Sequence, residues 1–113
     1  MFRSRFEAAD RGEFLALLLD GKNRMLGFNV VSVGSLTASP AHPREVFKAA
    51  ILANAAALIV MHNHPSGDPT RSAEDQAITQ RLKQAADLLG ISFLDHVVIE
   101  DSRYTSFADE GLL

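Results

Sequence analysis

Short apolar runs separated by turn residues dominate the first third of the chain. Residues 14–19 form a continuous apolar run, residues 20–23 are typical of a turn, and apolar positions resume and partly alternate over residues 25–33. This pattern predicts a β-hairpin. A glycine and a serine then break the second arm, and residues 36–38 are expected to form a third short strand. Residues 2–12 carry few apolar side chains and are expected to be weakly helical.

The hydrophobic spacing then changes from that of strands to that of helices. Proline 43 opens a stretch with apolar residues at helical spacing, which predicts a helix over residues 43–55. A second helix is predicted from Ser72, a typical N-cap, to Gly90, a typical C-terminal stop. The remaining apolar stretches are predicted to be strands, at residues 57–61, 91–99 and 104–107. The order hairpin, helix, strand, helix, strand, strand predicts an α/β fold with a mixed β-sheet flanked by helices.

Composition restricts the class of protein. The 113 residues have the size of one domain, and 47% apolar with 22% charged residues is ordinary for a soluble globular chain. The absence of cysteine excludes a disulfide scaffold and thiolate metal sites, and it fits a reducing compartment, so we expect a cytoplasmic protein. No apolar run is long enough to cross a membrane, and no apolar segment near the N-terminus suggests a signal peptide. We therefore expect no membrane association.

Two histidines directly follow the predicted 57–61 strand. In an extended chain His62 and His64 project from the same face, with Cα atoms about 6.5–7 Å apart, so both imidazoles can bind one ion. Asp75, in the first turn of the second predicted helix, supplies a third ligand if the intervening loop folds back over the histidines. Two imidazoles and one carboxylate leave a fourth position open, which is typical of catalytic zinc. Each residue alone also fits a purely structural role.

The spacing His-x-His-x₇-Ser-x₂-Asp, formed by His62, His64, Ser72 and Asp75, resembles the JAMM motif of the MPN/JAB metalloprotease fold. Further stretches resemble the RadC branch of that family, at residues 19–24, 42–46, 54–57, 62–69, 94–99 and 106–113. The resemblance implies a JAMM/MPN α/β sandwich of the cytidine-deaminase-like type.

The resemblance covers about residues 13–113 and divides the chain into an N-terminal segment, 1–12, and a RadC-like JAMM/MPN domain, 13–113. RadC proteins usually carry an additional N-terminal helix-hairpin-helix region. The chain is therefore expected to correspond to their C-terminal half, either as a fragment or as a short homologue.

The same resemblance implies a zinc hydrolase that cleaves a peptide or isopeptide bond in a peptide or protein substrate. Carried over to this chain, His62, His64 and Asp75 bind one zinc ion. Ser72 stabilises the oxyanion, which suits a hydroxyl beside the free N–H groups of a helix start.

A glutamate upstream of the motif takes the proton of the attacking water in that family. Glu13, immediately before the first apolar run, fits its position, although RadC proteins often place the acid where this chain has Gly12. Glu45, at the start of the first predicted helix, is the alternative base. His96 is interpreted either as a contact of a metal ligand or as a structural histidine.

A different function class stays open. The name RadC is attached to DNA repair, so the chain can also be interpreted as a DNA- or partner-binding module with a structural or vestigial metal site. The net charge of −3 and pI near 5.7 argue mildly against binding nucleic acid. However, residues 100–113 alone have a net charge of −3 and the rest of the chain has a net charge of zero, which leaves a local basic patch possible. The exposed edges of a small sheet can pair between chains, so a homo-oligomer also stays open.

Overall fold

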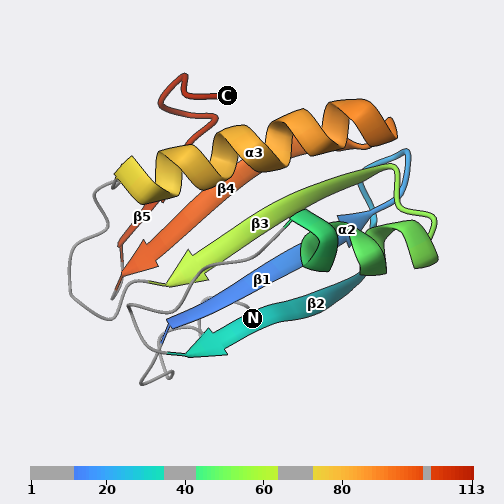
Figure 1. Cartoon of the computed structure of the whole chain (residues 1–113), viewed down its shortest axis with the longest axis horizontal. Helices are drawn as coiled ribbons and strands as arrows, with labels where there is room; N and C mark the ends of the chain where they lie inside the picture. Colours follow the sequence, from blue (N-terminus) through green and yellow to red (C-terminus); the bar gives the residue numbers. More distant parts are fainter. Residues whose placement is uncertain (1–11, 35–42, 64–72, 101–102) are drawn as a thin grey trace.

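The computed structural model describes residues 12–34, 43–63, 73–100 and 103–113, which form five strands and two helices (Figure 1). The elements are β1 (Gly12–Leu19), β2 (Met25–Gly34), α2 (Pro43–Leu52), β3 (Ala57–Asn63), α3 (Ala73–Leu89), β4 (Ser92–Glu100) and β5 (Arg103–Ser106). The weak helix expected before β1, the short strand at 36–38 and the loop between β3 and α3 lie outside the described residues. In the described part, no helix is long and apolar enough to span a membrane.

The strands form one mixed sheet in the order β2-β1-β3-β4-β5. Strands β3 and β4 are parallel and are connected through α3, whereas every other neighbouring pair is antiparallel. Parallel neighbours need a crossover connection, and a helix is its usual form. The predicted mixed α/β fold is thereby confirmed.

Both helices pack on the same face of this sheet, α3 over β4 and α2 toward β1 and β2 (Figure 1). One core cluster joins them to the strands, because alternate residues of β1 and β3 point toward the helices. Its largest fully buried members are Phe14, Leu58, Val60, Val46 and Leu82. The opposite sheet face carries a smaller cluster around Leu15 and Ile99. The helix-covered face is also the one on which the candidate site lies.

Each helix is followed within two residues by a residue with positive φ. In α2 this residue is Asn54 (φ 57°), and the N–H of Ala55 donates to the carbonyl of Ala50 at 2.9 Å. In α3 it is Gly90 (φ 73°), with Ile91 donating to Ala86 at 3.0 Å. Both are six-residue closures that satisfy the last carbonyl groups of a helix. The first predicted helix was therefore extended too far, because the left-handed asparagine stops it before residue 55.

The strand β3 runs to Asn63, two residues beyond its predicted end at 61. Its last residues pair with β4, His62 opposite Val98 and Asn63 opposite Ile99. The extension matters for the site because it places the first motif histidine within a hydrogen-bonded strand.

Candidate metal centre

His62 lies near the carboxyl end of β3, in the middle of the sheet. It pairs with Phe14 of β1 on one side and with Val98 of β4 on the other. Residues directly opposite in an antiparallel pair share a face, so His62 lies on the helix-covered side with Phe14. The two rings are in contact, with centroids 5.6 Å apart. The imidazole is thus held by strands on both sides, and only 20% of its side chain is exposed.

Asp75 approaches the histidine from the first turn of α3. Its side chain is only 5% exposed, and its Oδ1 atom lies 3.6 Å from Nδ1 of His62. A direct hydrogen bond between these atoms would need a separation of about 2.7–3.2 Å. By contrast, two ligand atoms on one tetrahedral zinc ion are roughly 3.3–3.5 Å apart, given Zn–N and Zn–O bonds near 2.0–2.2 Å. The separation therefore fits two ligands arranged around a shared cation.

The chemistry of the donors also fits a divalent ion. Imidazole nitrogen and carboxylate oxygen are both zinc ligands, and the Nδ1 atom of His62 is itself buried. The third predicted ligand, His64, and the predicted oxyanion donor, Ser72, lie outside the described residues, the latter immediately before α3. Within the described part, no group of three histidine or carboxylate side chains gathers around one point. The structure thus brings together His62 and Asp75.

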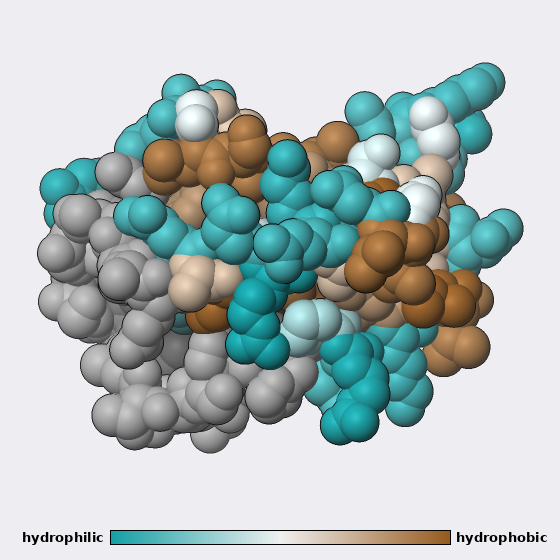
Figure 2. Space-filling model, turned by 45° about the horizontal axis from the view of Figure 1, so that its top comes forward, coloured by the Kyte–Doolittle hydropathy of each residue, from teal (hydrophilic) through white to brown (hydrophobic). Residues whose placement is uncertain are grey.

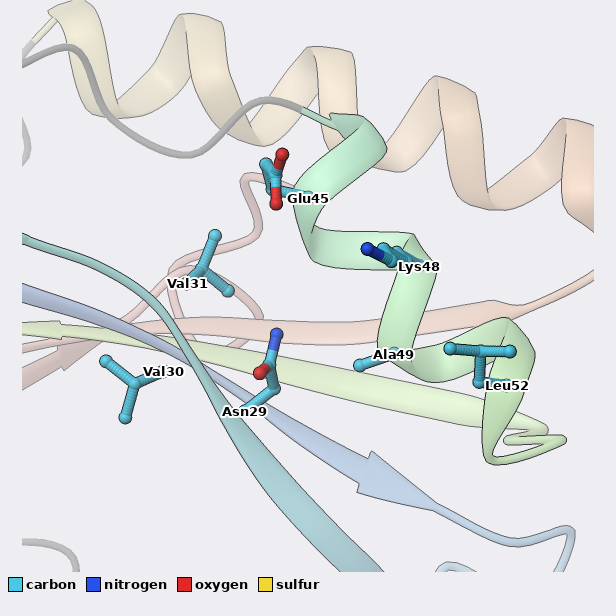
Figure 3. Close-up of a pocket in the computed structure, with 7 residues that line it drawn as sticks. All are labelled: Asn29, Val30, Val31, Glu45, Lys48, Ala49 and Leu52. Atoms are coloured by element: carbon cyan, nitrogen blue, oxygen red, sulfur yellow. The ribbon is translucent and has the colours of Figure 1, made fainter.

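The two candidate bases occupy different places. Glu13 is the second residue of β1, next to the residue that pairs with His62, and its side chain lies outside the described part. By strand alternation, the position that shares a face with Phe14 and His62 is position 12, which is glycine here. Glu45 is exposed in the first turn of α2. It lines a groove of about 240 Å³ between α2 and β2, together with Lys48, Val31 and Asn29 (Figure 3).

His96 is fully buried beside the candidate ligands. Its ring stacks on His62 with centroids 6.4 Å apart, and it also contacts Phe14 at 5.7 Å and Phe107 at 4.7 Å. Its Nδ1 atom lies 2.6 Å from the hydroxyl of Thr79. The sequence left two roles open for His96, a contact of a metal ligand or a structural histidine, and it did not indicate Thr79. The signal that could have found it is a hydroxyl four residues after Asp75 on the buried stripe of α3.

Asp95, the neighbour of His96 on β4, is engaged elsewhere. Its carboxylate accepts hydrogen bonds from the Ser106 hydroxyl at 2.5 Å and from the Ala108 N–H at 2.9 Å. It therefore holds the C-terminal turn against β4. This turn carries Phe107, which packs on His96.

The helix ends carry exposed apolar side chains. Ile51 and Leu52 at the end of α2, and Leu88 and Leu89 at the end of α3, are 48% to 89% exposed. In Figure 2, apolar residues gather toward the right, where both helices end. This surface lies at the opposite end of α3 from Asp75.

A five-stranded mixed sheet, with α2 and α3 packed on one face and a histidine facing the start of α3, is a JAB/MPN-like α/β fold. Residues 1–112 match the family described as the RadC-like JAB domain, and the chain belongs to that family. The resemblance found in the sequence motifs is thereby confirmed.

Similar proteins include three named only UPF0758 protein. The protein of Geotalea uraniireducens (strain Rf4) is 53% identical over 112 residues, which cover 99% of this chain and 49% of that protein. That of Desulforamulus reducens is 51% identical over 104 residues, covering 92% and 46%. That of Methanosarcina acetivorans is 50% identical over 109 residues, covering 96% and 48%. The chain spans about half the length of the curated relatives it matches.

Proposed function

We propose that the chain is a zinc-dependent hydrolase of the JAMM type that cleaves a peptide or isopeptide bond. The observation that carries this proposal is the 3.6 Å approach of His62 Nδ1 and Asp75 Oδ1 on a buried part of the sheet. Membership of the RadC-like JAB domain family supports it, since the motif in this chain has the full His-x-His-x₇-Ser-x₂-Asp spacing.

In this proposal His62, His64 and Asp75 hold the ion. When bound in such an open site, zinc supplies a Lewis acid for a carbonyl oxygen and lowers the pKa of a water molecule. The strand and helix keep their two side chains in place before any ion arrives, because His62 is fixed between β1 and β4 and Asp75 is buried in the first turn of α3.

Two further residues have proposed roles around the scissile bond. Ser72, directly before α3, donates its hydroxyl hydrogen to the developing oxyanion, aided by the positive end of the helix dipole. Glu13 takes the proton of the attacking water and returns it to the leaving amine. Its motif position supports this role, whereas strand alternation assigns position 12, and not position 13, to the face of His62. Glu45 is the alternative base, from its groove between α2 and β2.

Elemental analysis of the purified protein tests the metal site. We expect about one zinc per chain in the wild type, and much less in the His62→Ala, His64→Ala and Asp75→Asn variants. Asp87→Asn is the matched control, because Asp87 is an exposed carboxylate on the same helix. Equal zinc contents in Asp75→Asn, Asp87→Asn and the wild type would contradict the assigned ligands.

A hydrolysis screen tests the reaction. Zinc-loaded protein is incubated with quenched fluorescent peptides and with isopeptide-linked substrates, with and without a chelator. Cleavage that is lost on chelation and in Glu13→Gln supports the proposal. A zinc-loaded protein that cleaves neither class of substrate refutes the peptidase function.

The DNA-binding alternative is then tested by titrating duplex DNA at two salt concentrations, because phosphate-driven binding weakens steeply with salt.

A further inference from the structure

Thr79 connects the first turn of α3 to the strand β4. It lies one helical turn after Asp75 and is only 2% exposed. Its hydroxyl donates a hydrogen bond to the main-chain carbonyl of Asp75 at 2.9 Å, and the same oxygen lies 2.6 Å from Nδ1 of His96. A hydroxyl that bonds back to the carbonyl four residues earlier slightly weakens a helix. Helix stability alone therefore does not account for this arrangement.

One arrangement of protons satisfies both contacts of the Thr79 hydroxyl. A carbonyl oxygen only accepts, so the single hydrogen of the Thr79 hydroxyl is used toward Asp75. The hydroxyl oxygen then accepts from His96, and this arrangement requires the ring proton on Nδ1. The result is a directed chain from His96 through Thr79 to the backbone of Asp75, in which every partner is buried.

His96 also contacts the other candidate ligand. Its ring stacks on that of His62 at an interplanar angle of 29°, with the centroids 6.4 Å apart. The ring of Phe107 packs more closely against His96, with the centroids 4.7 Å apart. One fully buried side chain therefore contacts the imidazole on β3 and, through one hydroxyl, the backbone of the carboxylate on α3. The separation between His62 Nδ1 and Asp75 Oδ1 depends on how β3 and α3 pack against each other. His96 contacts the His62 ring on β3 and, through the Thr79 hydroxyl, the main chain of Asp75 on α3.

We propose that Thr79 and His96 are a positioning pair that sets the distance between His62 and Asp75, and thereby the affinity of the site for a divalent cation. This inference rests on the metal site of the proposed function. Partners that orient metal ligands from outside the coordination sphere typically change affinity by about 10–100-fold when removed. The same size of effect is expected here, although neither residue touches the ion.

Three variants separate positioning from general stability. Thr79→Val keeps the shape and removes the hydroxyl, Thr79→Ser keeps the hydroxyl, and His96→Phe keeps a ring between His62 and Phe107 but removes Nδ1. Leu82→Val is the matched control, because Leu82 is a fully buried core residue of α3 that belongs to the apolar cluster. The affinity for Zn²⁺ is measured by competition with a chromophoric chelator, and unfolding is followed on the same samples.

We expect Thr79→Val and His96→Phe each to weaken zinc binding by about 10–100-fold, and the double variant to lose no more than the worse single variant. Thr79→Ser should restore most of the affinity, and Leu82→Val should keep it despite lower stability. The absorption spectrum of the Co²⁺-loaded protein should change in Thr79→Val and not in Leu82→Val. Affinity within twofold of wild type in folded Thr79→Val overturns the proposal, as does a loss in Leu82→Val of the same size.

A measurement on the metal-free protein keeps this inference separate from the proposed function. Long-range ¹H–¹⁵N spectra of the His96 ring should show the proton on Nδ1 in the wild type and a different pattern in Thr79→Val. A wild-type protein that binds no zinc refutes the metal site and, with it, the effect on affinity. A proton found on Nε2 in the wild type overturns the positioning pair even where zinc binds as expected.

Discussion

Replacing Asp95 by alanine is expected to destabilise the domain by about 2–4 kcal/mol. The carboxylate accepts three hydrogen bonds: Oδ1 from the N–H groups of His96 (2.7 Å) and Ala108 (2.9 Å), and Oδ2 from the Ser106 hydroxyl (2.5 Å). A hydrogen bond to a charged group contributes about 1.5–3 kcal/mol. The side chain is only partly buried and its bond to the Ala108 N–H is exposed to water, so the sum is well below three full bonds.

Asparagine at the same position distinguishes this explanation from a general loss of packing. Asp95→Asn keeps an oxygen for the two N–H groups, and the Ser106 hydroxyl can rotate to accept from the amide, so the expected loss is about 1 kcal/mol. Asp109→Asn is the control, because Asp109 is exposed on the same turn. Urea unfolding measures all three free energies. A loss below about 0.5 kcal/mol for Asp95→Ala, or equal losses for alanine and asparagine, would refute the reasoning.

Three further predictions concern the hairpin, a helix end and the metal. Hydrogen bonds from the N–H groups of Arg24 and Lys22 lower the pKa of the Asp20 carboxyl from its ordinary value of 3.8. The contribution of Asp20 to stability is therefore present at neutral pH and is lost as the pH falls through that lowered pKa. The difference in urea midpoint between Asp20→Asn and wild type should narrow below pH 3.8. Gly90→Ala should lower the free energy of unfolding by about 1–2 kcal/mol, because φ at this position is 73°. No atom lies within 4 Å of the added Cβ, so this cost comes from the backbone conformation alone. Gly27→Ala, equally uncrowded in a strand, should instead be stabilising by roughly 0.5 kcal/mol, and unfolding curves that show equal effects would contradict this. Zinc at a hundredfold excess over its Kd should raise stability by about 2.7 kcal/mol, seen as an increase in Tm that is absent in Asp75→Asn.

The order of elements could be predicted from the sequence because each boundary carries a strong local signal. The turn after β1, Pro43 at the start of α2 and Gly90 after α3 are all of this kind. Boundaries set by pairing were missed. The strand β3 continues past residue 61 because β4 offers it partners, and no property of His62 itself indicates this. The end of α2 was missed because a left-handed asparagine is less distinctive than a glycine.

The site was predictable to a similar extent. His62 and Asp75 were found from motif spacing, and the structure brings their side chains together. The link between Thr79 and His96 could not be found in this way, because their contact depends on how α3 lies over β4. Spacing within one element reveals a shared face, whereas contact between two elements requires the tertiary packing.

The location of His62 and Asp75 on consecutive elements has a consequence for the chain entropy of the site. The two residues are 13 positions apart in sequence, and closing a flexible loop of that length costs roughly 2 kcal/mol beyond a constant, by the logarithmic dependence on loop length. Folding of β3 and α3 onto the sheet already meets this cost. An incoming cation therefore need not close that loop itself, so more of its interaction energy is available as affinity.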